Sequence, residues 1–252
     1  MSTPSFQPFR QLRRREQLGT AWTVFRLQTQ LIFSQRVVWF LSAILLYLGI
    51  LYAVNYRLAM NDRMDLETIY LMVMTMPLLV LTLYLHMQVI ITEKEQRTLE
   101  VMFTTAGSRH KVWLVRLGTL NALLWLMSVG MSLLVFFTFA DFSILGMACS
   151  VYATVFLVGS LTLFFAVRLR SSLGAGMVTA LVLLLHTFSA DIFHYNRTRY
   201  FLFFNPYDIP NQIDPRTWDI WAWQNRIGVM IIGLLLLFFA LRSLEHRDRL
   251  LR

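Results

Sequence analysis

Three side chains in the stretch HTFSADIFH are of the types that bind metal ions. His186, Asp191 and His194 offer two imidazoles and a carboxylate, which are ligands that catalytic zinc uses. Their spacing brings Asp191 and His194 to adjacent faces only if one helix carries both, and His186 need not join them. We therefore predict no metal site, and keep a metal-dependent intramembrane enzyme as the alternative interpretation.

A second group of polar side chains interrupts the apolar sequence at ITEKEQRTLEVMFTTAGSRHKVW, residues 91–113. Thr92 and Glu95 have the spacing of a capping box, and Gly107 suits the left-handed position after a helix end. The pattern predicts a short helix over residues 93–106. Its apolar positions recur at helical spacing and form one stripe, made of Leu99, Met102, Phe103 and Ala106.

This apolar stripe needs a surface to cover it. The protein's own helices, lipid headgroups and a soluble partner are the three candidates. Lipid is the poorest of these, because membrane-surface helices usually carry a basic face and this one carries Glu93, Glu95 and Glu100. The charges therefore favour either the protein itself or a partner protein.

The sequence lacks the groups that convert energy. It has no G-x-x-x-x-G-K-[ST] phosphate loop, so we expect no ATP hydrolysis by that chemistry and no cofactor on this chain. No Asp, Glu, Lys or Arg is predicted to lie deep in an apolar segment, although ion-driven transporters usually need such groups. We predict no catalytic residue, and a transport protein of this kind would receive its energy from another subunit.

The composition is that of a membrane protein. Of the 252 residues, 57% are hydrophobic and 15% charged, whereas soluble proteins average about 45–50% and roughly 25%. A hydrocarbon core of ~30 Å needs about 20 apolar residues in a helix. Six segments approach or meet this length, at residues 37–54, 69–91, 117–140, 144–167, 173–190 and 221–241.

Positive charge divides unevenly between the two sides of these segments. Of the 23 Lys and Arg residues, 17 lie on the side of both termini, and the other side has only Arg57, Arg63, Arg197, Arg199, Arg216 and Arg226. By the positive-inside rule both termini are cytoplasmic. The net charge of +9 reflects this topology, so no nucleic-acid partner is predicted.

A long connection precedes the last apolar segment, and we call residues 191–213 the outer segment. Its apolar run at 200–204 is far too short to cross a membrane, and the Pro residues at 206 and 210 prevent a helix from continuing. We expect the outer segment to dip into the outer leaflet, or to serve only as an aromatic anchor. Asp214 is predicted to cap the last helix and Pro215 to be its first residue.

The stretch TEKEQRTLEVMFTTAGSRHKVWLVRL resembles the region after the second span of type-2 ABC export permeases. That family carries a Glu-x-Glu-x-Gly-Thr-Leu-Glu pattern, which is matched here by Glu93, Glu95, Thr98, Leu99 and Glu100. Arg97 stands where the family usually has Gly, which leaves the backbone geometry at that residue open. Six spans, cytoplasmic termini and a long outer connection extend the resemblance over nearly the whole chain.

The resemblance implies an all-α permease subunit of an ATP-driven exporter in the bacterial plasma membrane. Residues 1–36 would form a cytoplasmic N-terminus with an amphipathic interface helix, and residues 37–252 the six-span permease domain. The interface helix, at 18–36, would bury Trp22, Phe25, Leu27, Leu31 and Ile32. A simple extension of the first span is the alternative for this region.

The resemblance also implies partners and site residues. The helix at 93–106 would be a coupling helix that docks into a separate ATP-binding subunit through Glu93, Glu95, Arg97, Thr98, Leu99, Glu100, Met102 and Phe103. Two copies of that subunit would hold ATP and Mg, and a second permease chain would complete a homodimer, with membrane lipids and accessory proteins as further partners. The outer segment would roof the substrate path as a gate formed by Tyr200, Phe201, Phe203, Phe204, Asn205 and Pro206. The transported substrate is not predicted.

Overall fold

A computed structural model describes residues 22–23, 25–27, 29, 35–58, 63–96, 109–169, 171–194 and 197–248. Within these residues the fold is all-α, without strands, as the sequence predicts. The helices are α2 (Gln35–Arg57), α3 (Leu66–Thr68), the π-helix η3 (Ile69–Thr75), α4 (Met76–Gln96), α6 (Arg109–Thr138), α7 (Ile144–Leu169), α8 (Ser172–Ile192) and α9 (Pro215–Asp248).

In the part of the chain that the structure describes, six stretches of helix are long and apolar enough to cross a membrane, which confirms the six predicted segments. They are Val37–Arg57, Leu66–Gln88, Trp113–Thr138, Ile144–Leu169, Ser172–Ile192 and Pro215–Ser243. The second of these joins α3, η3 and α4 into one unit. The last begins earlier than the apolar run suggests, because α9 continues through polar residues from Pro215.

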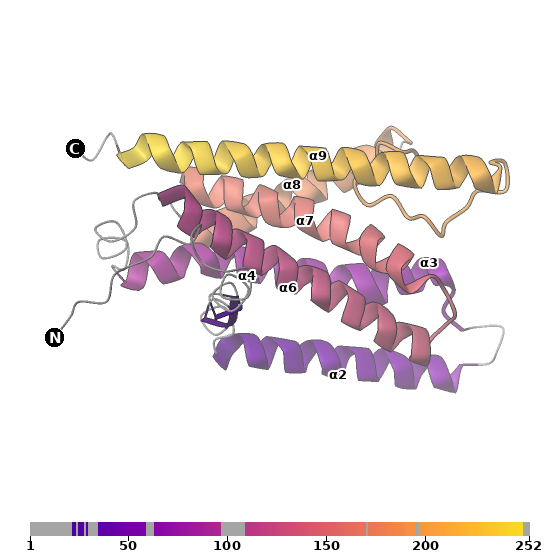
Figure 1. The fold of residues 1–252 in the computed structure, drawn as a ribbon. Helices are drawn as coiled ribbons and strands as arrows, with labels where there is room; N and C mark the ends of the chain where they lie inside the picture. Colours follow the sequence, from indigo (N-terminus) through magenta and orange to yellow (C-terminus); the bar gives the residue numbers. More distant parts are fainter. Residues whose placement is uncertain are drawn as a thin grey trace, which may run out of the picture.

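Helix α7 is the centre of the bundle. It packs against α9, α4, α6 and α8, and most of its residues are buried (Figure 1). Close approach depends on small residues at two contacts. Gly159 of α7 faces the ring of His86 on α4, and Gly233 of α9 faces Phe156 of α7. Small residues at such contacts let helices pack closely where lipid gives no hydrophobic drive.

A proline explains the π-helix in the second unit. The amide of Met76 bonds the carbonyl of Leu71, five residues back, and the hydroxyl of Thr75 donates to the carbonyl of Tyr70 at 2.7 Å. Pro77 follows and has no N–H, so the carbonyl of Met72 has no donor in this register. The wider π-helical turn therefore leaves the carbonyl of Met72 without a backbone donor, at the position where Pro77 interrupts the hydrogen bonds of the helix.

Helix α2 uses this free carbonyl to attach to the bundle. The hydroxyl of Tyr47 donates to the carbonyl of Met72 at 3.1 Å, and the side-chain oxygen of Asn55 accepts from the amide of Met64 at 2.9 Å. Most of the apolar side chains of α2 are exposed, and Trp39 is 72% exposed. Two polar contacts thus help to fix a helix that buries little of its own surface.

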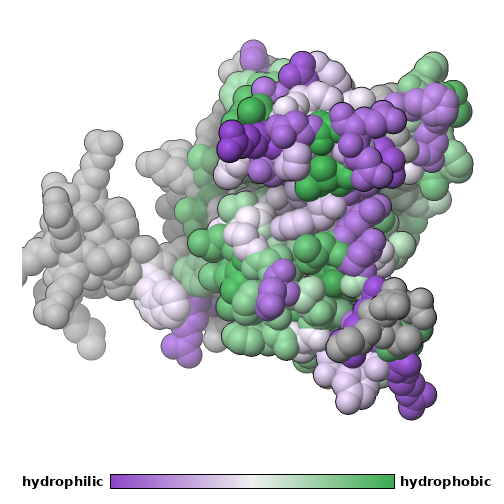
Figure 2. Space-filling model, turned by 90° about the vertical axis from the view of Figure 1, so that its right-hand side faces the viewer, coloured by the Kyte–Doolittle hydropathy of each residue, from purple (hydrophilic) through white to green (hydrophobic). Residues whose placement is uncertain are grey.

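The ends of the helices divide between the two ends of the bundle. Helix α2 begins and α9 ends at the same end, and α4 also ends and α6 begins there (Figure 1). The other end carries α3 and the starts of α7 and α9. We call it the predicted outer end. Figure 2 views the molecule from this end and shows hydrophilic residues gathered in its upper part, among hydrophobic ones.

Side chains cap two helices at this end. Asp65 accepts from the amide of Thr68 at 2.9 Å, and these hydrogen bonds from Thr68 hold the pKa of Asp65 below its usual range. Asp214 accepts from the amide of Thr217 at 3.3 Å, and Pro215 is the first residue of α9. The predicted start of the last helix is therefore confirmed.

The polar stretch after the second unit departs from the predicted pattern. Helix α4 runs without a break to Gln96, so Thr92 lies inside a helix and the predicted capping box at Thr92 is wrong. Continuing the backbone hydrogen bonds of α4 through this point satisfies the amides that a cap would otherwise serve. Residues 97–108, most of the predicted helix at 93–106, lie outside the described residues.

Candidate functional site

The most unusual side chain of the bundle is an arginine inside a span-length helix. Arg226 is the twelfth residue of α9, roughly 16 Å along the axis from the helix start. Only 6% of its surface is exposed. An arginine is always charged, and charged groups at membrane depth are costly, so they usually mark a functional site.

Oxygen atoms from four parts of the chain surround the guanidinium of Arg226. One terminal nitrogen donates to the hydroxyl of Tyr70 at 2.6 Å and to the carbonyl of Phe204 at 2.7 Å. The other donates at 3.2 Å to the hydroxyl of Thr154 and at 3.2 Å to the side-chain oxygen of Asn225. All four acceptors are neutral, and the Nε of Arg226 is buried without a hydrogen-bond partner.

The cluster joins η3, α7 and α9 to the outer segment. Its four protein partners come from Tyr70 on η3, Thr154 on α7, Asn225 on α9 and Phe204 in the outer segment. Across the described residues no carboxylate forms an ion pair with this arginine. The charge at the centre of the cluster is therefore balanced only by dipoles.

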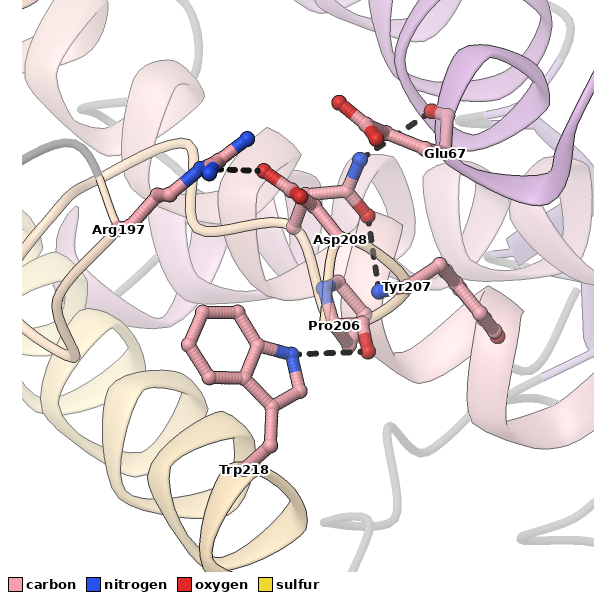
Figure 3. A network of polar contacts seen from close by, with 7 residues as sticks. Glu67, Arg197, Pro206, Tyr207, Asp208 and Trp218 are labelled. Carbon is pink, nitrogen blue, oxygen red and sulfur yellow. Dashed lines mark hydrogen bonds and ion pairs between the residues drawn. The ribbon is translucent and has the colours of Figure 1, made fainter. Parts of the chain in front are cut away.

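Neutral side chains on α9 donate hydrogen bonds to three further backbone carbonyls of the outer segment. The amide nitrogen of Asn225 donates to the carbonyls of Arg199 at 2.9 Å and Phe201 at 2.8 Å. The indole nitrogen of Trp218 donates to the carbonyl of Pro206 at 3.1 Å, as Figure 3 shows. Helix α9 thus binds the outer segment along much of its described length.

Contacts within the outer segment complete this attachment (Figure 3). Asn205 donates to the carbonyl of Glu67 on α3 at 3.2 Å and accepts from the amide of Tyr207 at 3.0 Å. Arg197 and Asp208 form an ion pair at 3.2 Å. These contacts fold the segment back over the predicted outer ends of α3 and α9.

Aromatic side chains close the segment over the cluster. Phe204 is fully buried, and its ring centroid lies 4.6 Å from that of Trp218, itself 1% exposed. Tyr207 lies 5.8 Å from Tyr70, ring to ring, and burial raises the pKa of Tyr207 to about 12. Burial therefore favours the protonated phenol of Tyr207.

The predicted gate residues divide by exposure. Phe204 is buried, whereas Phe201, Phe203, Asn205 and Pro206 are half-buried and Tyr200 is 72% exposed. The described part of the outer segment, from 197 onward, forms turns and not a helix, because its prolines remove amide donors. The structure gathers Phe204, Asn205 and Pro206 at contacts with α3 and α9.

The candidate metal ligands do not come together. The Nε2 of His186 accepts from the amide of Leu202 at 3.1 Å, and its ring stacks on Phe201 with centroids 5.4 Å apart. His194 lies beyond the end of α8 with a φ of 54°. Within the part of the chain that the structure describes, no three His, Cys, Asp or Glu side chains form a metal-binding group. The structure therefore does not bring His186, Asp191 and His194 into one metal-binding group.

The predicted coupling residues fall at the edge of the described chain. Glu93 and Glu95 belong to the last turns of α4, and Arg97, Thr98, Leu99, Glu100, Met102 and Phe103 lie outside the described residues. In the predicted interface helix, Phe25 packs on the main core and stacks on Trp22 at 5.8 Å. Leu31 and Ile32 are outside the described residues.

The sequence pattern alone did not indicate the Arg226 cluster. It predicts no charge deep in a span, and this prediction is wrong, because Arg226 is buried within α9. The last predicted segment, 221–241, places Arg226 near its start, whereas α9 starts at Pro215, eleven positions before Arg226. The available signal was local: with Asp214 and Pro215 starting the helix, Arg226 must lie several turns inside it.

Comparisons with protein-family models, curated proteins and solved structures found no match. The fold itself defines the class. Six span-length apolar helices make the chain a polytopic membrane protein, and its described site is a buried arginine cluster beneath the outer segment.

Proposed function

We propose that this chain is the membrane-spanning permease subunit of an ATP-driven ABC exporter. The observation that carries the proposal is the polar stretch between α4 and α6, with Glu93, Glu95, Thr98, Leu99 and Glu100 in the pattern of type-2 export permeases. In the sequence it falls between α4 and α6, and α4 ends and α6 begins at the end of the bundle where α2 begins and α9 ends. That placement suits contact with a soluble subunit on the same side as both termini.

In this proposal the chain moves substrate and another subunit hydrolyses ATP. The absence of a phosphate loop from this sequence supports the assignment of ATP hydrolysis to another subunit. Two ATP-binding subunits would close on ATP and push on the coupling residues of two permease chains. Substrate would then leave at the predicted outer end, past the outer segment.

Truncating the coupling stripe tests the proposal directly. Phe103→Ala should weaken docking of the ATP-binding subunit by about 2–4 kcal/mol, as loss of a buried aromatic anchor does at interfaces. The measurement is a pull-down of the ATP-binding subunit together with the thermal stability of the permease. Both should be run on the full chain in detergent.

Phe137→Ala is the matched control. It removes the same aromatic group from the other end of α6, where Phe137 is 78% exposed. This control should bind the ATP-binding subunit like the wild type. Normal ATPase binding and transport in Phe103→Ala would mean that the stripe packs on the permease itself, and the coupling assignment would then be wrong.

A further inference from the structure

The charge of Arg226 exceeds what its contact with the outer segment requires. The side chains of Asn225 and Trp218 are neutral, and they donate hydrogen bonds to backbone carbonyls of the outer segment at donor–acceptor distances of 2.8 to 3.1 Å. Neutral donors are therefore sufficient to bind such carbonyls. A neutral side chain could bind the carbonyl of Phe204 in the same way, without the cost of placing a charge at this depth. The guanidinium therefore needs a second explanation.

We propose that Arg226 is the recognition site for the anionic group of a transported amphiphile. The proposal rests on the transport role proposed above. In the closed arrangement the carbonyl of Phe204 occupies the guanidinium at 2.7 Å. When the outer segment lifts, that position becomes free for an oxygen of a phosphate or carboxylate, which binds arginine more strongly than a carbonyl does.

The cluster contains further donors for such an anion. The hydroxyls of Tyr70 and Thr154 accept from Arg226, so each keeps its own hydrogen for donation. The Nε of Arg226 is also without a partner and is buried. These donors from η3, α7 and α9 all lie at the guanidinium of Arg226, where an anion could engage them together.

The surroundings select a ligand with an apolar part. Arg226 lies within a span-length helix, and neighbouring side chains of α9 such as Trp223 and Ile227 are 65% and 56% exposed on its surface. Phe204 and Trp218 form an aromatic wall against the cluster. An anion that reaches Arg226 from the membrane must therefore carry a hydrophobic portion, as a phospholipid does.

Lipid retention by the purified full chain tests this proposal without the ATP-binding subunit. The protein is equilibrated with detergent micelles containing equal phosphatidylglycerol and phosphatidylcholine, and retained lipid is counted by native mass spectrometry. The wild type should prefer phosphatidylglycerol. Arg226→Gln should lower that preference about tenfold or more, as expected for the loss of one charge-assisted contact.

Two variants separate charge from structure. Arg226→Lys keeps the charge and should retain a clear preference for phosphatidylglycerol, although it loses the fork geometry. Arg216→Gln removes an exposed charge from the first turns of the same helix and should behave like the wild type. Equal retention by Arg226→Gln and the wild type would overturn the proposal, as would equal loss in Arg216→Gln. Competition by inorganic phosphate alone would overturn the requirement for a lipid.

A closed-state lock keeps the proposal testable if Arg226→Gln does not fold. Cysteines at Glu67 and Asn205, in a Cys149→Ser background, can be joined by a short reducible thiol cross-linker, because Asn205 contacts the Glu67 carbonyl. The locked protein should lose its preference for phosphatidylglycerol and regain it on reduction. Undiminished retention in the locked protein would overturn the proposal. Normal ATPase docking in Phe103→Ala would contradict the coupling assignment but leave these lipid-retention outcomes unaffected, so the two proposals fail separately.

Discussion

At the scale of single residues, the bundle places polar side chains where their hydrogen bonds are local. Ser128 and Thr162 donate to the carbonyls four residues back in their own helices, at 2.9 and 2.8 Å. His86 does the same toward Thr82 at 2.9 Å, so its Nδ1 carries the proton. Arg226 differs from these residues, because three of its four partners come from other parts of the chain.

Gly159 gives a prediction at this scale. A Cβ added there would lie 2.7 Å from Nε2 of His86, whose ring is held by its bond to Thr82. Gly159→Ala should therefore destabilise the bundle by about 1–3 kcal/mol, the usual cost of overpacking. The measurement is chemical unfolding in detergent, monitored by tryptophan fluorescence.

Gly130→Ala is the control for this prediction. A Cβ at Gly130 meets nothing within 4 Å, so this variant should match or slightly exceed the wild type in stability. Equal stabilities of the Gly159 and Gly130 variants would show that His86 moves aside and that the α4–α7 contact is soft.

At the scale of elements, the π-helix is both a consequence of Pro77 and the attachment point of α2. The proline removes one amide from the helix, and η3 shifts the resulting gap to the carbonyl of Met72. Because α2 buries little apolar surface, the hydroxyl of Tyr47 gains importance as the donor that fills this gap.

Tyr47→Phe tests the attachment of α2. Loss of the hydroxyl should cost about 0.5–1.5 kcal/mol of stability, because the Met72 carbonyl is then left without its donor. Tyr56→Phe, on the exposed face of the same helix, is the matched control and should be neutral. Chemical unfolding of both variants measures the difference. A neutral Tyr47→Phe would mean that apolar packing alone holds α2.

The cap of α3 gives a pH-dependent prediction. Since the folded state lowers the pKa of Asp65 from 3.8, the carboxylate stabilises the fold above that pH, and this contribution is lost as pH falls through the folded pKa. Asp65→Ala should cost about 0.5–2 kcal/mol at neutral pH. The difference from the wild type should shrink below about pH 4, because the protonated carboxyl is a weaker cap.

Asp65→Asn separates charge from capping. Asn caps helices as well as Asp but does not titrate, so the stability of Asp65→Asn should depend less on pH in this range. Thermal unfolding of the three proteins from neutral to acidic pH measures the effect. A constant difference between Asp65→Ala and the wild type across this range would contradict the assignment of the cap to the ionised carboxylate.

At the scale of the whole molecule, one buried helix organises four others. Helix α7 contacts α9, α4, α6 and α8, so helices from distant parts of the sequence share one core. The six span-length helices place the start of α2 and the end of α9 at the same end (Figure 1). The charge pattern predicts that this end faces the cytoplasm.

Cysteine labelling tests the orientation. In a Cys149→Ser background, Gln212→Cys should react with a membrane-impermeant thiol reagent in intact cells, because Gln212 is exposed at the predicted outer end. Ser243→Cys, near the other end of α9, should react only after lysis. Labelling of Ser243→Cys in intact cells would contradict the predicted orientation and indicate the opposite topology.

The sequence by itself determined the features that depend on neighbouring residues. Six apolar runs of sufficient length define the six helices. The dipeptide Asp214-Pro215 marks the start of α9, because capping and a preset φ act within one turn. The predicted cap at Thr92 was wrong for the same local reason, since a helix already in progress needs no cap there.

Only the tertiary structure decided which polar residues share a site. Arg226 and Tyr70 are 156 positions apart in the chain, and their contact forms only when η3, α7 and α9 pack together. Likewise the Phe204 carbonyl reaches Arg226 because the outer segment folds back onto α9, a path that no short-range pattern specifies. Such contacts depend on the relative placement of whole helices. The burial of this charge could therefore be recognised only from the packed bundle.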